Sequence, residues 1–320
     1  MDKYSIDAAI IAKDEVANLN DLIQNLSAFC RSIILVDTGS MDNTPTFASS
    51  LGAEVYFHQW TNNFAHSRNY AIKYTTAEWI LSIDADERVD INSLRNCLSL
   101  MNNPEVGGIR LNIINYTNTE QTQYTEHRYT RLFRRDPRIK FEGAIHEQVS
   151  ESIIGAGFKI EDADTNIFHY GYINPGEKKK QRNITMLEEE HKHSPESAWY
   201  KFHLASAEFA NNNLPRAKEL FTQAISGSEL AVEQHEMSIV RLAQIALKAG
   251  EHQEIDKLSF NSIGNASLSG LLKSIYATSL LERKCFAEAY KIYSDEEVLN
   301  SAMVDRDSIQ SMLAALKDVL

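Results

Sequence analysis

Residues 79–87, Trp-Ile-Leu-Ser-Ile-Asp-Ala-Asp-Glu, decide the fold, because they have the pattern of a buried strand that ends in acids. Asp84 and Asp86 are separated by one residue, so both carboxylates are expected on the same side of the strand. Paired negative charges are unfavourable unless a cation lies between them. Oxygen ligands suit Mg²⁺ or Mn²⁺, and such an ion commonly shares its ligands with substrate phosphates. A solvated acidic turn is the alternative interpretation.

Short apolar runs alternate with helix-type segments before this strand, which indicates parallel strands joined by crossover helices. The sequence therefore predicts a doubly wound α/β sheet, in which ligands bind beyond the carboxyl ends of the strands. Polar clusters follow three of the predicted strands, at residues 13–15, 37–40 and 84–87. The predicted strands are 7–12, 32–36, 54–57 and 79–83, and the predicted helices are 16–29, 43–51 and 64–74.

Glycine and proline thin out in the second half, where residues 177–320 hold 4 Gly and 2 Pro against 9 Gly and 4 Pro before them. We place a domain boundary at about 175, which gives domains 1–175 and 176–320. The second domain repeats a small-residue helix, a polar turn and a further helix. Its turns at Asn213, Gly250 and Lys284 are 37 and 34 residues apart, near the tetratricopeptide period of about 34.

Ala217 and Ala287 occupy matching places in this repeat. We therefore expect an all-α domain of tetratricopeptide-like hairpins that contacts a partner, with an ordinary helical bundle as the alternative.

Composition excludes several classes of protein. The net charge of −12 argues against nonspecific binding to nucleic acid or anionic lipid. Three scattered cysteines without a CxxC pattern argue against a disulfide scaffold and a structural zinc site. The apolar run 8–12 is too short for a signal peptide, and no run is long enough to span a bilayer. We therefore expect a soluble, cytoplasmic protein.

Four motifs occur in order: AAIIAKDE (8–15), ILVDTGSMDNT (34–44), HSRNYAI (66–72) and WILSIDADE (79–87). With them, residues 6–175 resemble the family 2 glycosyltransferases, whose GT-A fold is a nucleotide-sugar-binding sheet flanked by helices. The chain is most similar to bacterial members with a tetratricopeptide-like carboxyl extension. These include the peptide S-glycosyltransferases of glycosylated bacteriocins.

The resemblance implies roles for residues that match the family's motifs. Asp37 would hold the uracil ring, although Thr38 replaces the second acid of the usual turn. Arg68 would reach the nucleotide or its diphosphate. The alternative for Asp37 is an acid that forms an Asx turn before Gly39, and the alternative for Arg68 is a charge on the helix surface. The implied nucleotide-sugar site is Ala12, Lys13, Glu15, Asp37, Arg68, Asp84 and Ala85, and the implied metal ligands are Asp84, Asp86 and His169.

Two further segments of the first half carry chemistry. Arg and Lys fill six of the thirteen positions 128–140. This segment would either contact an anion or form a solvated hairpin with a turn at Asp136-Pro137. Glu142, His146 and Glu147 are candidates for the base, and a regular strand would put Glu142 and His146 on one face. The alternative for His146 is a purely structural role, in which its hydrogen bonds are made within a strand. Basic residues 178–182 would cover the diphosphate or remain solvated.

The resemblance implies an inverting, metal-dependent hexosyltransferase that moves a sugar, with glucose as the commonest choice, from a UDP-sugar to an acceptor. The acceptor would be a peptide Cys, Ser or Thr, or alternatively a saccharide or lipid-linked acceptor of the cell envelope. Nucleotidyl transfer is a less favoured interpretation, because that reaction normally uses a glycine-rich phosphate loop and the first loop here, AKDEVANL, has no glycine. A repeat-based interaction protein is the non-enzymatic alternative. The helical domain could also form a homodimer.

Overall fold

In the computed structural model of the chain, which describes residues 5–171, 177–227, 230–258 and 263–320, the apolar runs form one eight-stranded sheet. Its strand order is β3-β2-β1-β4-β7-β6-β8-β5. The strands are β1 (Ile6–Ala12), β2 (Ser32–Asp37), β3 (Glu54–Phe57), β4 (Trp79–Asp84), β5 (Glu87–Val89), β6 (Val106–Tyr116), β7 (Tyr124–Arg134) and β8 (Lys159–His169). The chain divides into two compact units, Met1–Thr119 with Thr125–Asn174, and Glu120–Tyr124 with Pro175–Leu320.

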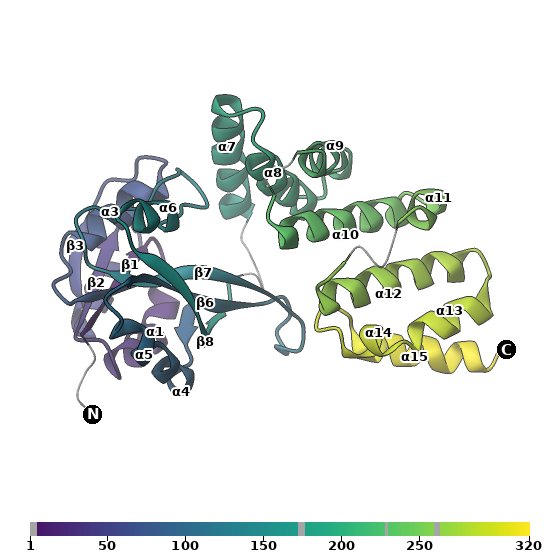
Figure 1. The fold of residues 1–320 in the computed structure, drawn as a ribbon, viewed down its shortest axis with the longest axis horizontal. Helices are drawn as coiled ribbons and strands as arrows, with labels where there is room; N and C mark the ends of the chain where they lie inside the picture. Colours follow the sequence, from purple (N-terminus) through teal and green to yellow (C-terminus); the bar gives the residue numbers. More distant parts are fainter. Residues whose placement is uncertain (1–4, 172–176, 228–229, 259–262) are drawn as a thin grey trace. The chain divides into compact units, whose positions relative to one another are not determined.

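The first four strands are parallel, as the sequence predicts (Figure 1). In their register Ala12 lies beside Asp37, and Ile11 lies beside Asp84, so the polar clusters meet at one edge. β7 joins β4 in the antiparallel direction. β8 pairs in parallel with β6 and antiparallel with β5. The predicted α/β sheet with flanking helices is confirmed.

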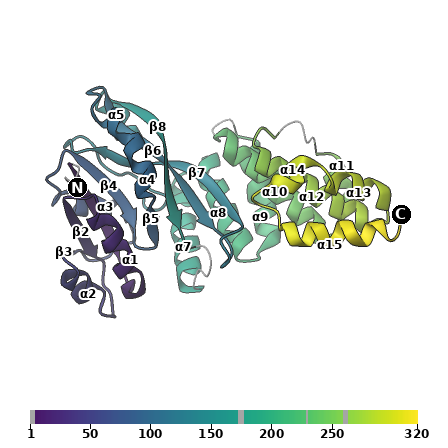
Figure 2. The ribbon, with the colours of Figure 1, turned by 90° about the horizontal axis from the view of Figure 1, so that it is seen from below.

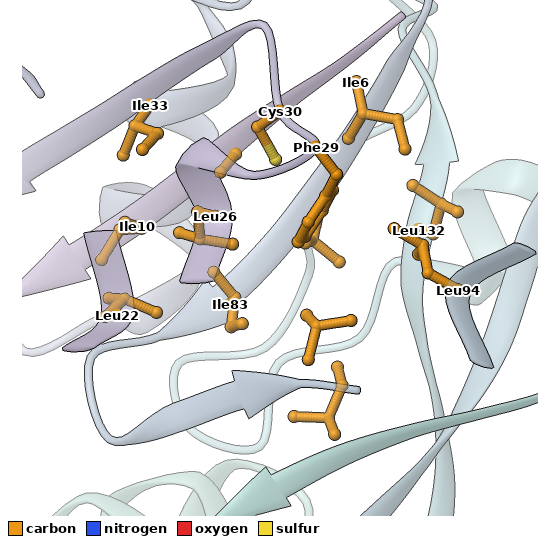
Figure 3. Packing of buried hydrophobic residues seen from close by; sticks show 14 of the residues in the cluster. Ile6, Ile10, Leu22, Leu26, Phe29, Cys30, Ile33, Ile83, Leu94 and Leu132 are labelled. Carbon is orange, nitrogen blue, oxygen red and sulfur yellow. The ribbon is translucent and has the colours of Figure 1, made fainter. Parts of the chain in front are cut away.

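Both faces of the parallel part of this sheet are covered, which explains why β1, β2 and β4 have no simple alternation of polar and apolar residues. Ile6 and Ile10 of β1 pack in one cluster with α1 (Val16–Ser27), as Figure 3 shows. Ala9, between them, belongs to a second cluster with α3 (Phe64–Ile72). α4 (Ile91–Leu94) lies against β8 and α5 (Leu98–Met101) against β6 (Figure 2). The other short helices are α2 (Thr44–Ser50), the 3₁₀ turn Arg95–Cys97 and α6 (Ser150–Gly155).

The segment 141–149 is irregular, so the condition under which Glu142 and His146 would share a strand face, a regular strand, is not met. One antiparallel bridge joins Glu142 to Gln148. Between them Gly143 has a φ of 95° and His146 a φ of 54°, both in the left-handed region. These residues turn the chain back on itself. The side chains of Glu142 and His146 therefore do not share a strand face.

The second unit consists of helices, and its hairpins confirm the predicted repeat pattern. Turns with a left-handed residue separate α8 from α9, α10 from α11 and α12 from α13, at Asn212, Gly250 and Lys284. The helices are α7 (Glu177–His193), α8 (Ala198–Ala210), α9 (Leu214–Ile225), α10 (Val232–Lys248), α11 (His252–Asp256), α12 (Ala266–Glu282), α13 (Phe286–Tyr293), α14 (Glu296–Asn300) and α15 (Arg306–Lys317).

One detail of the predicted repeat is wrong. Ala217 is fully buried five residues after Asn212, and the residue five after Lys284 is the equally buried Ala289. Ala287 is exposed, since the position of α13 that corresponds to Ala217 lies two residues later, at Ala289.

Gly270 of α12 offers a test of the packing in this unit. A Cβ added there would lie 2.1 Å from the backbone oxygen of Glu297 in α14. Gly→Ala normally stabilises a helix by up to about 1 kcal/mol, but here we expect Gly270→Ala to lower the free energy of unfolding by about 1–3 kcal/mol. Urea unfolding measures the change, with Ser274→Ala on the same helix as the control. An increase in stability would contradict this account of the packing.

Candidate active site

The first two polar loops form one wall of the site because they are hydrogen-bonded to each other. Asp14 N donates to Ser40 Oγ at 2.9 Å, and Met41 N donates to Asp14 Oδ1 at 2.6 Å. The carbonyl of Ala12 accepts from Thr38 N at 2.9 Å. Between these contacts Lys13 is exposed. Glu15, also predicted for this wall, is half-buried at the start of α1 and accepts from Asn18.

Asp37 both makes the Asx turn and keeps an oxygen for another group. Its Oδ1 accepts from Gly39 N at 2.9 Å and Ser40 N at 3.0 Å. Its Oδ2 is buried and has no hydrogen-bond partner among the described residues. Burying an acceptor without a partner is costly. The unpartnered oxygen is therefore a natural acceptor for an N–H group of a ligand.

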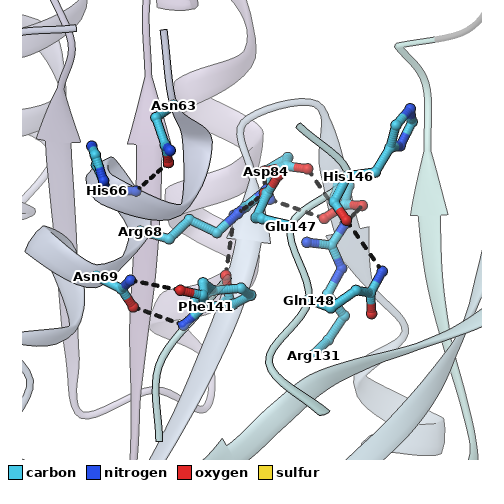
Figure 4. Close-up of polar contacts among 12 residues, drawn as sticks. Asn63, His66, Arg68, Asn69, Asp84, Arg131, Phe141, His146, Glu147 and Gln148 are labelled. Atoms are coloured by element: carbon cyan, nitrogen blue, oxygen red, sulfur yellow. Dashed lines mark hydrogen bonds and ion pairs between the residues drawn. The ribbon is translucent and has the colours of Figure 1, made fainter. Parts of the chain in front are cut away.

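Arg68 is buried, which rules out the helix-surface alternative. Asn63 caps the start of α3 by accepting from His66 N, and the helix then directs Arg68 toward β4 (Figure 4). The guanidinium donates to Ser82 Oγ at 3.1 Å, to Asp84 Oδ1 at 2.7 Å and to Glu147. Burial lowers the pKa of Arg68, but the two carboxylates outweigh it and raise that pKa.

Asp84 is held between two arginines. Its Oδ1 pairs with Arg68, and its Oδ2 lies 3.3 Å from Arg131 Nη2. The same Arg131 nitrogen lies 2.7 Å from Glu87 Oε1, while Glu87 Oε2 accepts from Asp84 N at 2.9 Å. Burial alone would raise the pKa of Asp84, but the two arginines hold that pKa well below its usual range. The pKa of Glu87 is raised, because its burial outweighs the charge of Arg131.

Asp86 and His169 face each other beside this cluster. His169 Nε2 lies 3.4 Å from Asp86 Oδ1. A Cβ at Gly171 would clash with Asp86 Oδ2 and His169 Nε2, so only a glycine can lie this close to both side chains. This donor set fits a divalent cation. Among the described residues no three His, Cys, Asp or Glu side chains could hold a metal by themselves, so other ligands would have to complete its coordination.

A histidine-rich face borders the acidic cluster. His127, Tyr129 and Arg131 alternate along β7 and so lie on one face of it. Burial, helped by the charge of Arg131, lowers the pKa of His127 to about 3. Burial lowers the pKa of His146 to about 4. Both imidazoles are therefore neutral at pH 7 and can accept protons.

The three candidates for the base lie in different surroundings. Glu147 is buried and ion-paired with Arg68. The side chain of Glu142 is more than half exposed and lies 3.0 Å from Lys140 Nζ. His146 is half-buried, and a positive charge on its ring would lower the pKa of His127. The structure therefore brings Glu147 to the cluster, whereas the ring of His146 points away from it and Glu142 pairs with a surface lysine (Figure 4).

Most of the basic stretch 128–140 stabilises the fold. Arg134 donates to the carbonyls of residues 101, 103 and 106, and its guanidinium lies over the ring of Trp79. Arg128 pairs with an acid of β8, Asp164, at 3.0 Å. The expected turn at Asp136-Pro137 lies after the end of β7. Only Arg131, among the described basic residues of this stretch, enters the acidic cluster.

Sequence reasoning missed the roles of Arg131 and Glu87. The pattern His127-x-Tyr129-x-Arg131 is a signal that could have revealed a polar strand face, because its members alternate. Lys178, Lys180 and Arg182 belong to α7 in the other unit; the side chain of Lys178 lies outside the described residues, and Arg182 donates to Asn183.

A doubly wound sheet with polar ligand-type groups beyond its parallel strands defines an α/β domain of the nucleotide-binding class. Residues 7–159 match the family model Glycosyl transferase family 2. This part of the chain is a family 2 glycosyltransferase domain, which confirms the predicted family, its GT-A-type fold and the enzyme class.

Two relatives and one solved structure illustrate the likeness. A TPR repeat-containing protein of Synechococcus elongatus is 31% identical over 173 residues, which cover 52% of this chain and 42% of the relative. The SPbeta prophage-derived glycosyltransferase SunS of Bacillus subtilis is 28% identical over 210 residues, 63% of this chain and 48% of the relative. This chain thus spans less than half the length of each. Glucosyl-3-phosphoglycerate synthase from Mycobacterium tuberculosis, solved with Mg²⁺ and uridine-diphosphate, has a TM-score of 0.41 at 14% identity over 58% of this chain and 79% of that chain.

Within the described ranges, no helix combines the length and the apolar character that a membrane span requires.

Gly171→Ala tests the space beside Asp86 and His169. The added methyl group would displace Asp86 and His169, the metal ligands that the family resemblance implies, so we expect Mn²⁺ affinity in the presence of UDP to fall at least about tenfold. Electron paramagnetic resonance titration measures free Mn²⁺, and circular dichroism checks that the fold is unchanged. Gly155→Ala is the matched control, because a Cβ there meets no atom within 4 Å. Equal affinity in Gly171→Ala and the wild type would place the cation elsewhere.

Arg131→Met tests the buried ion cluster. It leaves Asp84 and Glu87 with one arginine fewer, so we expect the free energy of unfolding at neutral pH to fall by about 3–5 kcal/mol. Arg131 lowers the pKa of both carboxyls in the folded wild type, so its removal raises both pKa values relative to the wild type. The loss is therefore complete at pH values above those pKa values and shrinks as the pH falls and the groups become protonated.

Urea unfolding of Arg131→Met at about pH 5 and about pH 8 measures this dependence. Arg128→Met on the same strand is the control. Its ion pair with Asp164 is exposed, so its loss should cost less than about 1 kcal/mol. An equally small loss for Arg131→Met would show that the cluster contributes little to stability.

Proposed function

We propose that the family 2 domain transfers a sugar from a UDP-sugar to an acceptor with inversion at the anomeric carbon, in a reaction that needs a divalent cation. The observation that carries this proposal is the pair Asp86 and His169, whose side chains lie 3.4 Å apart and pack against Gly171. This pair lies at the carboxyl end of β4, where a doubly wound sheet binds its ligand.

The donor's base would lie against the first two loops. The unpartnered Oδ2 of Asp37 would accept the imide N–H of uracil. Ala12, Lys13 and Glu15 would line the base and ribose, and Asp84 with Ala85 would lie beyond them. Glucose is the sugar we propose first, on the basis of the family resemblance.

Asp86 and His169 would hold Mn²⁺ or Mg²⁺, with the diphosphate oxygens and water as further ligands. When bound, the cation neutralises the charge of the diphosphate leaving group. An imidazole ligand favours Mn²⁺ over Mg²⁺. Both oxygens of Asp84 are taken by arginines, so we propose that Asp84 and Arg68 shape the site and that Asp86 is the acid that contacts the metal.

His146 is the base that we propose. The attacking sulfur or oxygen of the acceptor forms a bond to the anomeric carbon as the bond from that carbon to the diphosphate breaks, and the proton passes to the base. His146 is neutral at pH 7, because burial lowers its pKa to about 4. Glu147 is less suited, since its carboxylate is bound to the guanidinium of Arg68.

The acceptor we propose is a peptide with a Cys, Ser or Thr side chain. The helical hairpins of the second unit support this proposal, because stacked hairpins form extended surfaces that bind peptides. A saccharide or lipid-linked acceptor would be the outcome of the same assay if peptides fail. A homodimer formed through the helical unit is a further proposal that sedimentation would test.

A screen of nucleotide-sugars with Mn²⁺ tests the donor, with mass spectrometry detecting slow hydrolysis or transfer. We expect a UDP-sugar to be consumed by the wild type and not by Asp86→Ala. Calorimetric titration with UDP and Mn²⁺ should show binding, which a pure interaction protein would lack. Full activity of Asp86→Ala would overturn the proposed metal site.

His146→Gln tests the base. We expect kcat to fall by about 10²- to 10⁴-fold, while the KM for the donor changes little. In the wild type, kcat/KM should rise with pH through about 4 and level off toward neutrality, because only neutral His146 accepts a proton. That rise should be absent in the variant.

The exposed Glu161 of β8 provides the control Glu161→Gln, which should keep the wild-type kcat. An unchanged kcat in His146→Gln would assign the proton to another group, and Glu147→Gln would then be compared with it.

A further inference from the structure

Asn115 lies where three strands bring two histidines together. It is near the end of β6, the strand between β7 and β8, and is 3% exposed. In the register of β6 and β8, Asn115 lies directly beside His169. Its amide contacts His169 of β8 on one side and His127 of β7 on the other.

The hydrogen bonds of Asn115 fix which way its amide points. Its Nδ2 donates to the carbonyl of Thr125 at 3.4 Å and to His127 Nδ1 at 3.0 Å. A carbonyl can only accept, so the nitrogen of the amide must face Thr125. The Oδ1 of Asn115 therefore faces His169 Nδ1, at 2.8 Å.

This orientation dictates where the protons of both histidines lie. Because Oδ1 can only accept, His169 Nδ1 must carry a proton, and the lone pair of the neutral ring is then on Nε2. Nε2 lies 3.4 Å from Asp86 Oδ1. Burial lowers the pKa of His169, but the hydrogen bond to Asp86 and the nearby carboxylates outweigh it and raise that pKa. His127 accepts at Nδ1, so its proton lies on Nε2. Its pKa of about 3 is consistent with a ring that accepts a hydrogen bond at neutral pH.

We propose that Asn115 is a positioning residue that fixes the Nδ1–H tautomer of His169 and so presents Nε2 with Asp86 to a divalent cation. The proposal rests on the proposed metal site. A hydrogen bond to the distal nitrogen of a ligating imidazole fixes its tautomer and increases its basicity, and its loss commonly weakens metal binding by about 10- to 100-fold. Nothing in the sequence pattern marks Asn115, because an asparagine near the end of a strand has no distinctive spacing.

The test begins with the tautomer itself, in the full chain without metal. Long-range ¹H–¹⁵N spectra of histidine-labelled protein at about pH 9, where imidazoles are neutral, distinguish the two tautomers. The His169 signal is identified by its loss in His169→Gln. We expect the Nδ1–H form in the wild type and in Asn115→Asp, whose carboxylate still accepts from Nδ1. We expect a mixture of forms in Asn115→Leu.

Metal binding is the second readout, by electron paramagnetic resonance titration with Mn²⁺ and UDP. Asn115→Leu should weaken binding by about 10- to 100-fold, whereas Asn115→Asp should retain it. Asn112→Leu on the same strand is the matched control, because Asn112 bonds Glu126 and Asn166 instead. It should change neither readout.

An Nε2–H tautomer of His169 in the wild type, or wild-type Mn²⁺ affinity in folded Asn115→Leu, would overturn the proposal. If Asn115→Leu fails to fold, the spectra of the wild type and of Asn115→Asp still decide. A wild-type protein that shows the Nδ1–H form but binds no Mn²⁺ with UDP would refute the proposed function and leave the tautomer assignment standing.

Discussion

The carboxylate of Asp84, held between Arg68 and Arg131, is the interaction on which the site depends. One arginine comes from a helix and the other from an antiparallel strand, and both meet the end of a parallel strand. When two charges are removed from water, the free energy lost on desolvation exceeds that gained by pairing unless the partners are close and well aligned. Here each oxygen of Asp84 has its own guanidinium, and the contacts fix β4, β7 and α3 to one another.

The same arrangement positions the irregular loop 141–149. Arg68 holds Glu147, while the neighbouring Asn69 exchanges two hydrogen bonds with the backbone of Phe141, at 2.8 and 2.9 Å. Phe64 N donates to the carbonyl of Ala144 at 2.7 Å. A loop with two left-handed residues has no strand ladder to hold it, so α3 supplies the contacts that keep Glu147 at the cluster. Folding of the loop thus depends on a helix far from it in the sequence.

The sequence predicts the parallel half of the sheet well because its information is local. β3 has the predicted bounds, and β1, β2 and β4 differ from prediction by one residue at an end. Buried apolar runs and polar strand ends need no knowledge of distant partners. The prediction of Asp84 and Asp86 as a paired site rests on the same local pattern, because they end an apolar run, whereas the family resemblance supplies Asp37 and His169.

The remaining features could not be predicted, because they depend on which strands become neighbours. Arg131 is one of six basic residues in its segment, and only the β4–β7 pairing directs it to Asp84 rather than to solvent. Asn115 acquires its role from lying between β7 and β8. The left-handed φ of His146 breaks the alternation from which a strand face was inferred. Each of these features is a property of tertiary contacts between distant segments.

The charges of the cluster argue for a cation in the reaction. Arg68 and Arg131 carry two positive charges, and Asp84, Glu87 and Glu147 carry up to three negative ones. The arginines are therefore fully used within the protein and offer no surplus charge to a departing diphosphate. His127 and His146 are neutral at pH 7, because burial lowers the pKa of each. A metal ion at the proposed site of Asp86 and His169 would supply the preorganised charge near the diphosphate that such a transfer requires.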